Sequence, residues 1–321
     1  MKRRFQGFVA VSWVCALGIT GSVADERIPD WAYVVNPPSL KPVPDDGIPR
    51  GVPGSERRFT LTQIRDVAHA PDWHPGDHPA MPAPVAHGPR PGVLACGYCH
   101  LPNGLGRPEN SSLAGLPVDY IVRQVAEFRS GTRRSSEPRS LPVNFMVSTA
   151  KGALDDEVRE AAEYFSALPL TPWIRVVESD TVPVPVITGW MLAPADPPAT
   201  EPIGRRIVEM PEDLERTELR DARSGFVAYV PPGSIERGRA LAAGQSKGLT
   251  ACSVCHGAGL RGLGPVPGLA GRSPSYVVRQ LHDMRNGSRD GLWATLMKPV
   301  VSVLTPDDIL DLAAYTASLA P

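Results

Sequence analysis

The chain has 321 residues, 21% of them charged, and a formal net charge of −1 at pH 7. This balance argues against nucleic acid as a partner, because domains that bind nucleic acid present a strongly basic face. Beyond the N-terminal run no stretch is long and apolar enough to suggest a membrane span, so no integral membrane segment is expected in the mature protein.

Residues 1–24 have the pattern of a secretory signal. Basic residues at 2–4 precede a short apolar run over 8–21, and small residues lead to a cut expected after Ala24. The run is too short for a good membrane span. We therefore expect an exported, soluble, periplasmic protein, whose mature chain carries a net charge of −4 because the signal holds three basic and no acidic residues. Cys15 lies inside the signal and is interpreted as an apolar filler.

Residues 25–92 are proline-rich, with 14 of the 36 prolines, so long helices are not expected there. Aromatic residues such as Trp73 indicate that the segment packs onto something, and we predict an arm wrapped over the domain that follows. His74 and His78 have the spacing of two metal ligands on a helix, but each precedes a proline. Ordinary loop histidines are favoured over a metal site.

A five-residue pattern, C-x-x-C-H, occurs at residues 96–100 and again at residues 252–256. It is the attachment pattern of c-type haem, in which two cysteine sulfurs bond the porphyrin and the histidine binds the iron. Residues three apart lie on one side of a helical turn, so one short helix can present both sulfurs to one edge of the ring. The expected attachment and ligand residues are Cys96, Cys99 and His100, and Cys252, Cys255 and His256.

Zinc and thioredoxin-like redox chemistry are the alternatives for these motifs. Zinc would need two more ligands near each cysteine pair, and a thioredoxin-like pair does not need the histidine in both copies. The motifs use all four cysteines of the mature chain, so no structural disulfide is expected. The prediction is two covalently bound haems c.

The motifs belong to an internal repeat with a constant offset of 156 residues, in which 115–133 matches 271–289. We place two domains of one fold at residues 93–170 and 235–321. Apolar residues at helical spacing predict an amphipathic helix in each repeat, ended by Gly131 or by its counterpart Gly287.

A further helix is predicted at the end of each domain. In the second domain Thr305 is its expected N-cap, and Leu154 at the corresponding place in the first domain predicts a weaker start.

Residues 171–234 form a long inter-domain segment with another ten prolines. Residues 174–177 and 226–230 read as strands, and Trp173 and Trp190 indicate that the segment packs between the two domains. Its charge balance is −4, against +3 for residues 235–321. Such an asymmetry can steer a redox partner, although a solvated surface is its usual meaning.

Each iron needs a second axial ligand or an open position. Met146 and Met297 each lie 18 residues before a matched tyrosine, Tyr164 or Tyr315, in what is expected to be a loop between two helices. A thioether favours reduced iron, raises the potential and fills the last coordination site, which is typical of an electron carrier. A buried loop methionine is the alternative interpretation.

The chain resembles the two-domain, two-haem class I cytochromes c of the bacterial periplasm. The resemblance rests on the paired C-x-x-C-H motifs, the repeated Gly…Tyr-x-x-x-Gln…Arg-x-Gly-x-Arg helices, the methionines and the closing helices around Tyr164 and Tyr315. It implies an all-α fold of two cytochrome c class I domains in tandem. It also implies a backbone carbonyl that holds each haem histidine, within 267–271 in the second domain and within 111–115, which lacks proline, in the first.

The expected function is that of a carrier, passing single electrons from a dehydrogenase or quinol-linked donor to an oxidase or another acceptor. A dihaem peroxidase is one alternative, but it needs two unlike haems, whereas the two repeats are closely matched. A cytochrome subunit of a larger oxidoreductase is the other alternative, with the arm and the inter-domain segment as its interface.

Overall fold

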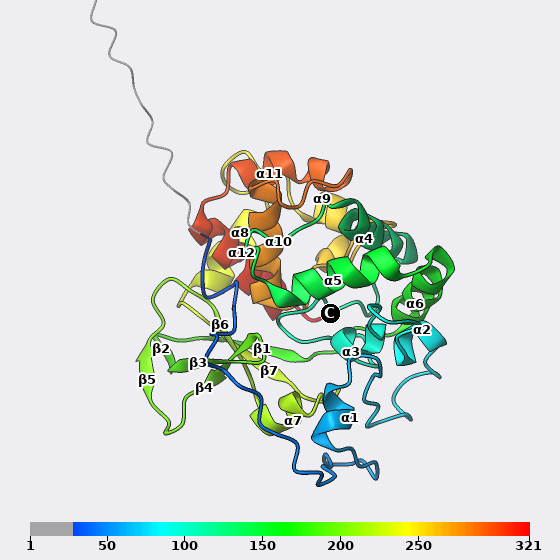
Figure 1. The fold of residues 1–321 in the computed structure, drawn as a ribbon. Helices are drawn as coiled ribbons and strands as arrows, with labels where there is room; N and C mark the ends of the chain where they lie inside the picture. Colours follow the sequence, from blue (N-terminus) through cyan, green and yellow to red (C-terminus); the bar gives the residue numbers. More distant parts are fainter. Residues whose placement is uncertain (1–27) are drawn as a thin grey trace, which may run out of the picture.

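A computed structural model describes residues 28–321, and the expected signal lies outside the described residues. Two helical units and a segment of short strands make up this part of the chain (Figure 1). No helix within residues 28–321 is long and apolar enough to cross a membrane.

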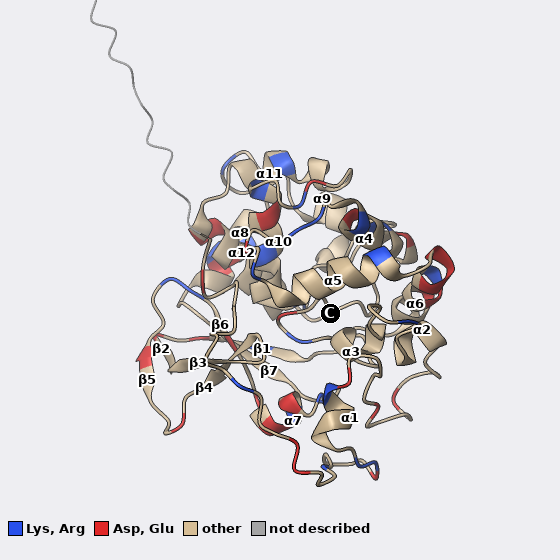
Figure 2. Ribbon diagram, in the orientation of Figure 1, with Lys and Arg blue, Asp and Glu red and all other residues tan. Residues whose placement is uncertain are grey.

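The first unit contains α3 (Cys96–His100), α4 (Val118–Ser130), α5 (Leu141–Gly152) and α6 (Asp155–Ala167). The predicted helix ending at Gly131 is confirmed, since α4 buries Ile121 and Phe128 and Gly131 takes a left-handed φ of 79°. Leu154 has no side-chain acceptor to cap α6, and its backbone N–H instead donates to the Glu157 carboxylate at 2.8 Å. Acidic residues gather at this end of α6, where the helix dipole favours negative charge (Figure 2).

The second unit contains α8 (Ser234–Ala242), α9 (Ser253–His256), η1 (Ala258–Leu260), α10 (Pro274–Arg285), η2 (Ala294–Leu296), α11 (Lys298–Ser302) and α12 (Pro306–Ser318). The N-cap prediction at Thr305 is confirmed. Its hydroxyl accepts from the Asp308 backbone N–H at 3.2 Å, and the Asp308 carboxylate accepts from the Thr305 N–H at 2.6 Å. This capping box satisfies two backbone donors at the start of α12.

The segment between the units is a small β-structure, so the all-α expectation holds only for the two helical units. It contains β1 (Ile174–Glu178), β2 (Thr181–Pro183), β3 (Pro185–Thr188), β4 (Met191–Pro194), β5 (Thr200–Pro202), β6 (Val208–Pro211), α7 (Leu214–Glu218) and β7 (Phe226–Val230). β7 pairs in parallel with β1 and antiparallel with β6, whereas β2–β5 and β3–β4 form two antiparallel ribbons. The two predicted strands are confirmed as β1 and β7, where β-branched and aromatic residues favour extended backbone.

The predicted packing of Trp173 between the two units is confirmed. Its ring lies in the hydrophobic core of the first unit with Phe165 and Phe226. Its indole N–H donates to the Gly271 carbonyl of the second unit at 3.1 Å. The β-segment therefore joins the two helical units rather than tethering them loosely.

The arm, which is predicted to wrap over the first unit, also contacts the second unit and the β-segment. Ala32 and Tyr33 lie in the core of the second unit, where the Tyr33 hydroxyl donates to the Asp283 carboxylate at 2.7 Å. Trp73 packs in a separate cluster with Leu219 of the β-segment and donates to its carbonyl at 2.7 Å. Each of these contacts gives a buried phenol or indole the acceptor it needs.

The later part of the arm packs on the first unit, where the Ala95 N–H donates to the Val67 carbonyl at 3.1 Å. The arm contains two short helices, α1 (Leu61–Arg65) and α2 (Ala83–Ala86). Val85 of α2 is buried in the first unit's core, and α2 contacts α3 and α6 much as α8 contacts α12 in the second unit. The packing of the first unit thus begins before residue 93.

Candidate haem centres

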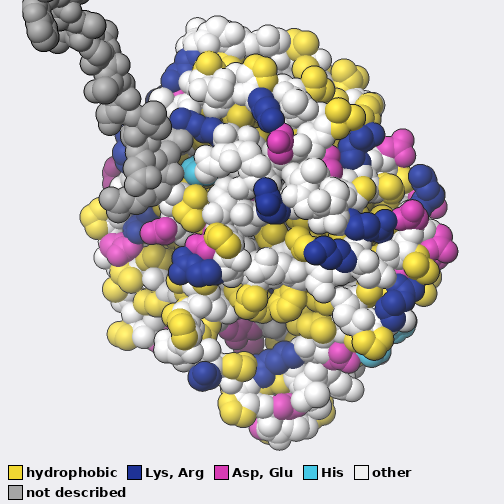
Figure 3. Space-filling model, turned by 45° about the horizontal axis from the view of Figure 1, so that its top comes forward, with side chains coloured by type: hydrophobic (Ala, Val, Ile, Leu, Met, Phe, Trp, Pro, Cys, Tyr) yellow, Lys and Arg dark blue, Asp and Glu magenta, His cyan; other side chains and the backbone are white. Residues whose placement is uncertain are grey.

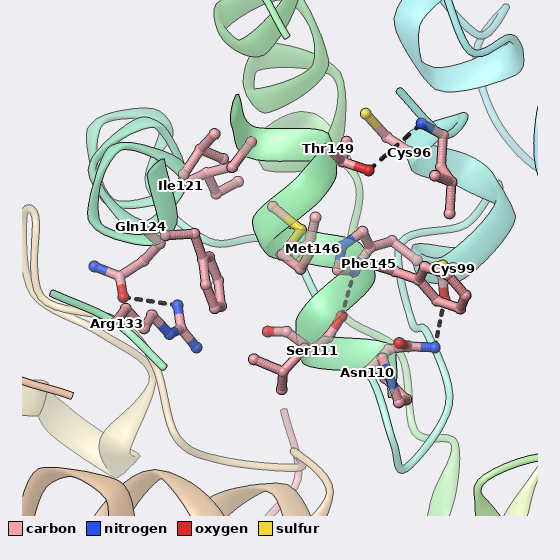
Figure 4. A pocket seen from close by; sticks show the side chains of 18 of the residues that line it. Cys96, Cys99, Asn110, Ser111, Ile121, Gln124, Arg133, Phe145, Met146 and Thr149 are labelled. Carbon is pink, nitrogen blue, oxygen red and sulfur yellow. Dashed lines mark hydrogen bonds between the residues drawn. The ribbon is translucent and has the colours of Figure 1, made fainter. Parts of the chain in front are cut away.

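One cavity in the first unit brings together all four residues predicted there. Cys96, Cys99, His100 and Met146 line it, with apolar side chains from α4 to α6 as most of its wall and residues of the second unit such as Tyr276 on one side. In Figure 4 the two cysteines reach it from α3, and Met146 points into it from α5. The spacing of the motif places both sulfurs on one turn, as the sequence predicts.

Met146 lies within helix α5 and not in the expected loop. Pro142 stands in the first turn of α5, where a proline costs no hydrogen bond, and nothing after it interrupts the helix before Ala153. The helix still presents the thioether to the cavity, so the error concerns the local structure of this segment and not the position of Met146.

A backbone carbonyl fixes the orientation of His100. Its Nδ1 lies 2.8 Å from the Ser111 carbonyl oxygen, which can only accept, so Nδ1 carries the proton and Nε2 keeps its lone pair. Burial lowers the pKa of His100 to about 4, opposed by the bond to Ser111. A neutral imidazole with a free Nε2 is the form that binds a metal, so this residue fits the haem iron.

His256 has the same arrangement. Its Nδ1 lies 2.8 Å from the Pro267 carbonyl oxygen, and burial lowers its pKa. Both acceptors follow their histidine by eleven residues. The carbonyl bonds that the family resemblance implies are therefore confirmed in both units, with serine serving as well as proline because the acceptor belongs to the backbone.

Met297 lies at the junction of η2 and α11 and packs against Met284, Ala294 and Val301. Cys252 packs instead at the edge of the larger core of this unit. The described contacts do not bring Met297 and Cys252 into one cluster, so a ligand role for Met297 stays a prediction.

The chemical state of the cysteines bears on the two alternatives for the motifs. Burial raises the pKa of Cys96 to about 12 and also raises the pKa values of Cys99 and Cys252. Redox-active thiols need the opposite shift, because the thiolate is the nucleophile. In residues 28–321 no group of three or more His, Cys, Asp or Glu side chains is placed to hold a metal ion.

The two motifs differ in how they are covered. In the first, Tyr98 is buried beneath the Arg220 guanidinium, which stacks 3.7 Å from the ring centroid and donates to the Tyr98 carbonyl at 2.8 Å. In the second, Val254 is 62% exposed and Cys255 is also exposed. The β-segment thus covers one haem-attachment turn, while solvent reaches the other.

Repeated residues from both units form a buried network between them. Arg133 donates to Gln124 at 2.7 Å and, across the interface, to Tyr276 and Gln280 at 2.9 Å each. Its counterpart in the repeat, Arg289, donates to Gln280 at 3.1 Å. Across the interface it donates to the residues that match Tyr276 and Gln280, namely Tyr120 at 3.0 Å and Gln124 at 2.9 Å.

Backbone bonds repeat this two-fold arrangement. The Arg134 N–H donates to the Ser288 carbonyl and the Asp290 N–H donates to the Thr132 carbonyl, both at 2.7 Å. The sequence analysis found this repeat but assigned it no interface role. The available signal was that the tyrosine, the glutamine and the arginine of this network each recur at the same offset of 156 residues.

The chain is similar in sequence to known c-type cytochromes. No family model matches the chain. The chain is 31% identical over 233 residues to cytochrome c4 of Azotobacter vinelandii, which covers 71% of this chain and 85% of that protein. It is 28% identical over 242 residues to a thiosulfate dehydrogenase electron acceptor of Thiomonas intermedia, which covers 74% of this chain and 84% of that protein.

Among solved structures, the chain is similar to a thiosulfate dehydrogenase of Marichromatium purpuratum, with 26% identity and a TM-score of 0.45. That match covers 71% of this chain but spans only 37% of the other.

Proposed function

Because this chain belongs to the cytochrome c4 family of dihaem class I cytochromes c, we propose that it holds two covalently attached haems c and carries single electrons between redox proteins in the periplasm. The observation that carries this proposal is the pair of C-x-x-C-H turns whose histidines are held by a backbone carbonyl at 2.8 Å in both units. The chain is an electron-transfer protein and not an enzyme. Export rests on the signal pattern of residues 1–24.

Each centre would use residues of one unit. Cys96 and Cys99 would form the thioethers of the first haem, with His100 and Met146 as its axial ligands. Cys252, Cys255, His256 and Met297 would serve the second. Bound at these residues, each haem supplies a reversible one-electron couple.

The protein itself orients the ligand histidines and excludes water from the centres. Burial keeps each imidazole neutral, and the carbonyls of Ser111 and Pro267 hold its Nδ1–H so that Nε2 is turned toward the centre. Apolar side chains of the first cavity, such as Ile121 and Phe165, keep that centre dry, which makes nearby charges more effective. Residues 93–170 and 235–321, with the end of the arm, are proposed as the two haem domains.

We further propose a dehydrogenase as the electron donor, with a thiosulfate dehydrogenase as the first candidate, because two relatives are named as electron acceptors of that enzyme. The second unit offers the more accessible attachment turn. Large hydrophobic side chains such as Val254 and Leu263 are exposed on it. Hydrophobic side chains also gather at the end of the molecule formed by α9 and α11 (Figure 3). Exposed apolar surface of this kind suits a transient docking contact.

The test is to mix the holoprotein with a thiosulfate dehydrogenase and thiosulfate and to follow haem reduction optically. Reduction should need both enzyme and substrate, and Val254→Lys should slow it, whereas Val186→Lys, at an exposed position in the β-segment, should not. Steady turnover of peroxide, or carbon monoxide binding by the reduced wild type, would contradict the carrier function. Failure of this donor alone would remove only the donor proposal.

A further inference from the structure

Arg272 is a buried cation placed between the two units, with 6% of its surface exposed. Its Nε donates to the Gly268 carbonyl at 2.7 Å, within its own unit. Its Nη1 crosses to the first unit and donates to the Ser112 carbonyl at 2.8 Å, with the Ser112 hydroxyl at 3.2 Å. Its Nη2 donates to the Ala114 carbonyl at 3.2 Å. One guanidinium therefore joins two loops that are about 160 residues apart in the sequence.

These loops are the ones that orient the histidines. Ser111 supplies the acceptor for His100, and Pro267 supplies the acceptor for His256. Arg272 bonds the residue directly after each acceptor, Ser112 in one loop and Gly268 in the other. Because a guanidinium is planar and its donors are fixed in direction, the two loops cannot shift independently without breaking one of these bonds.

Arg272 lies within the repeat but has no arginine counterpart in the first unit. The matched position in the first unit is Leu116, which is buried in that unit's apolar core. In the buried network between the units, by contrast, Arg133 of the first unit is mirrored by Arg289 of the second. A single cation thus serves both loops.

We propose that Arg272 is the positioning residue for both haem-ligating histidines and that its charge raises the reduction potentials of both centres together. This inference rests on the proposed function. The four acceptors are neutral oxygens, and no carboxylate is among the described contacts of Arg272. A positive charge in a poorly solvated interior favours the less positively charged state of a nearby redox group, so its removal favours oxidation.

Burial lowers the pKa of Arg272 to about 10, so the side chain remains charged at neutral pH. The charge is therefore present throughout the range in which the carrier works, and its effect should not depend on pH near neutrality.

Two substitutions separate the charge from the bridge. Arg272→Gln removes the charge, and both midpoint potentials should shift downward in an optical titration of the holoprotein. Arg272→Lys keeps the charge but cannot reach both loops. Both potentials should then stay near the wild-type values, while amide hydrogen exchange should become faster in at least one of the loops 111–115 and 267–271.

Arg220→Gln is the matched control, because Arg220 is also a buried arginine but bonds only Tyr98 in the first motif. It should shift the first centre alone. The inference is overturned if Arg272→Gln moves neither potential or only one, or if Arg272→Lys leaves exchange in both loops unchanged. Should Arg272→Gln not fold, the lysine variant decides. Wild-type protein without two haems would refute the proposed function. Wild-type protein with two haems, whose midpoint potentials do not change in Arg272→Gln, would refute this inference alone.

Discussion

The buried network between the units makes a quantitative prediction about stability. Arg133→Ala removes three hydrogen bonds, to Gln124, Tyr276 and Gln280. Hydrogen bonds to charged groups contribute roughly 1.5–3 kcal/mol each, but both glutamines keep a bond to Arg289. We therefore expect a loss of about 2–4 kcal/mol in the free energy of unfolding, and a similar loss for Arg289→Ala.

The double variant should cost more than the sum of the two single variants. Once both arginines are gone, the Gln124 and Gln280 side-chain oxygens lose their charged donors in a buried interface. A buried acceptor left without a partner costs about 1–3 kcal/mol. The excess over additivity should therefore exceed about 1 kcal/mol, measured by urea unfolding of the holoprotein and followed by circular dichroism.

Arg129→Ala supplies the control for this cycle. Arg129 belongs to the same helix as Gln124, but it donates to Ala150, Ala153 and Asp155 and shares no acceptor with Arg133. Arg129→Ala combined with Arg133→Ala should be additive. An additive double variant of Arg133 and Arg289 would show that the shared glutamines do not couple the two units.

Three further predictions concern the site and the fold. Met146→Ala and Met297→Ala should each lower the reduction potential of one haem, since axial ligands set haem potentials over about 0.8 V. Each should also let the reduced protein bind carbon monoxide at one site. Unchanged spectra and potentials in both variants would refute the two methionines as axial ligands. Leu154→Thr should supply the missing N-cap of α6 and raise the free energy of unfolding by about 1 kcal/mol, with Thr305→Ala as the opposite change at α12. Burial raises the pKa of Glu209 above its ordinary value of 4.5, so the stability that depends on its proton is present at low pH and is lost as the pH rises above 4.5. Over that range the free energy of unfolding of the wild type should fall relative to that of Glu209→Gln, by at most about 1.4 kcal/mol per pH unit. A difference that does not change with pH would contradict this.

The repeat made much of the helical structure predictable. Gly131 ends α4 and Thr305 caps α12 as the local sequence requires, because both effects depend on neighbouring residues only. The bonds from His100 and His256 to backbone carbonyls followed from the resemblance and needed no particular side chain.

Other features depend on contacts between distant segments. Tyr33 packs on Asp283, 250 residues away in the sequence. No local sequence pattern indicates that Tyr33 contacts the second unit and not the first. Arg220 and Arg272 look like ordinary surface charges in the sequence, yet both are buried and bond carbonyls next to the haem motifs or their loops. Arg220 lies outside the repeat and Arg272 matches Leu116, so the comparison of the two units gave no signal for either.

The mass of the intact, denatured holoprotein tests the central claim most directly. If both C-x-x-C-H turns attach a haem through their cysteines, the mass should exceed that of the mature apo-chain by two haems, and a variant with Cys252 and Cys255 both replaced by alanine should keep one. A wild-type mass with one haem or none would contradict the account.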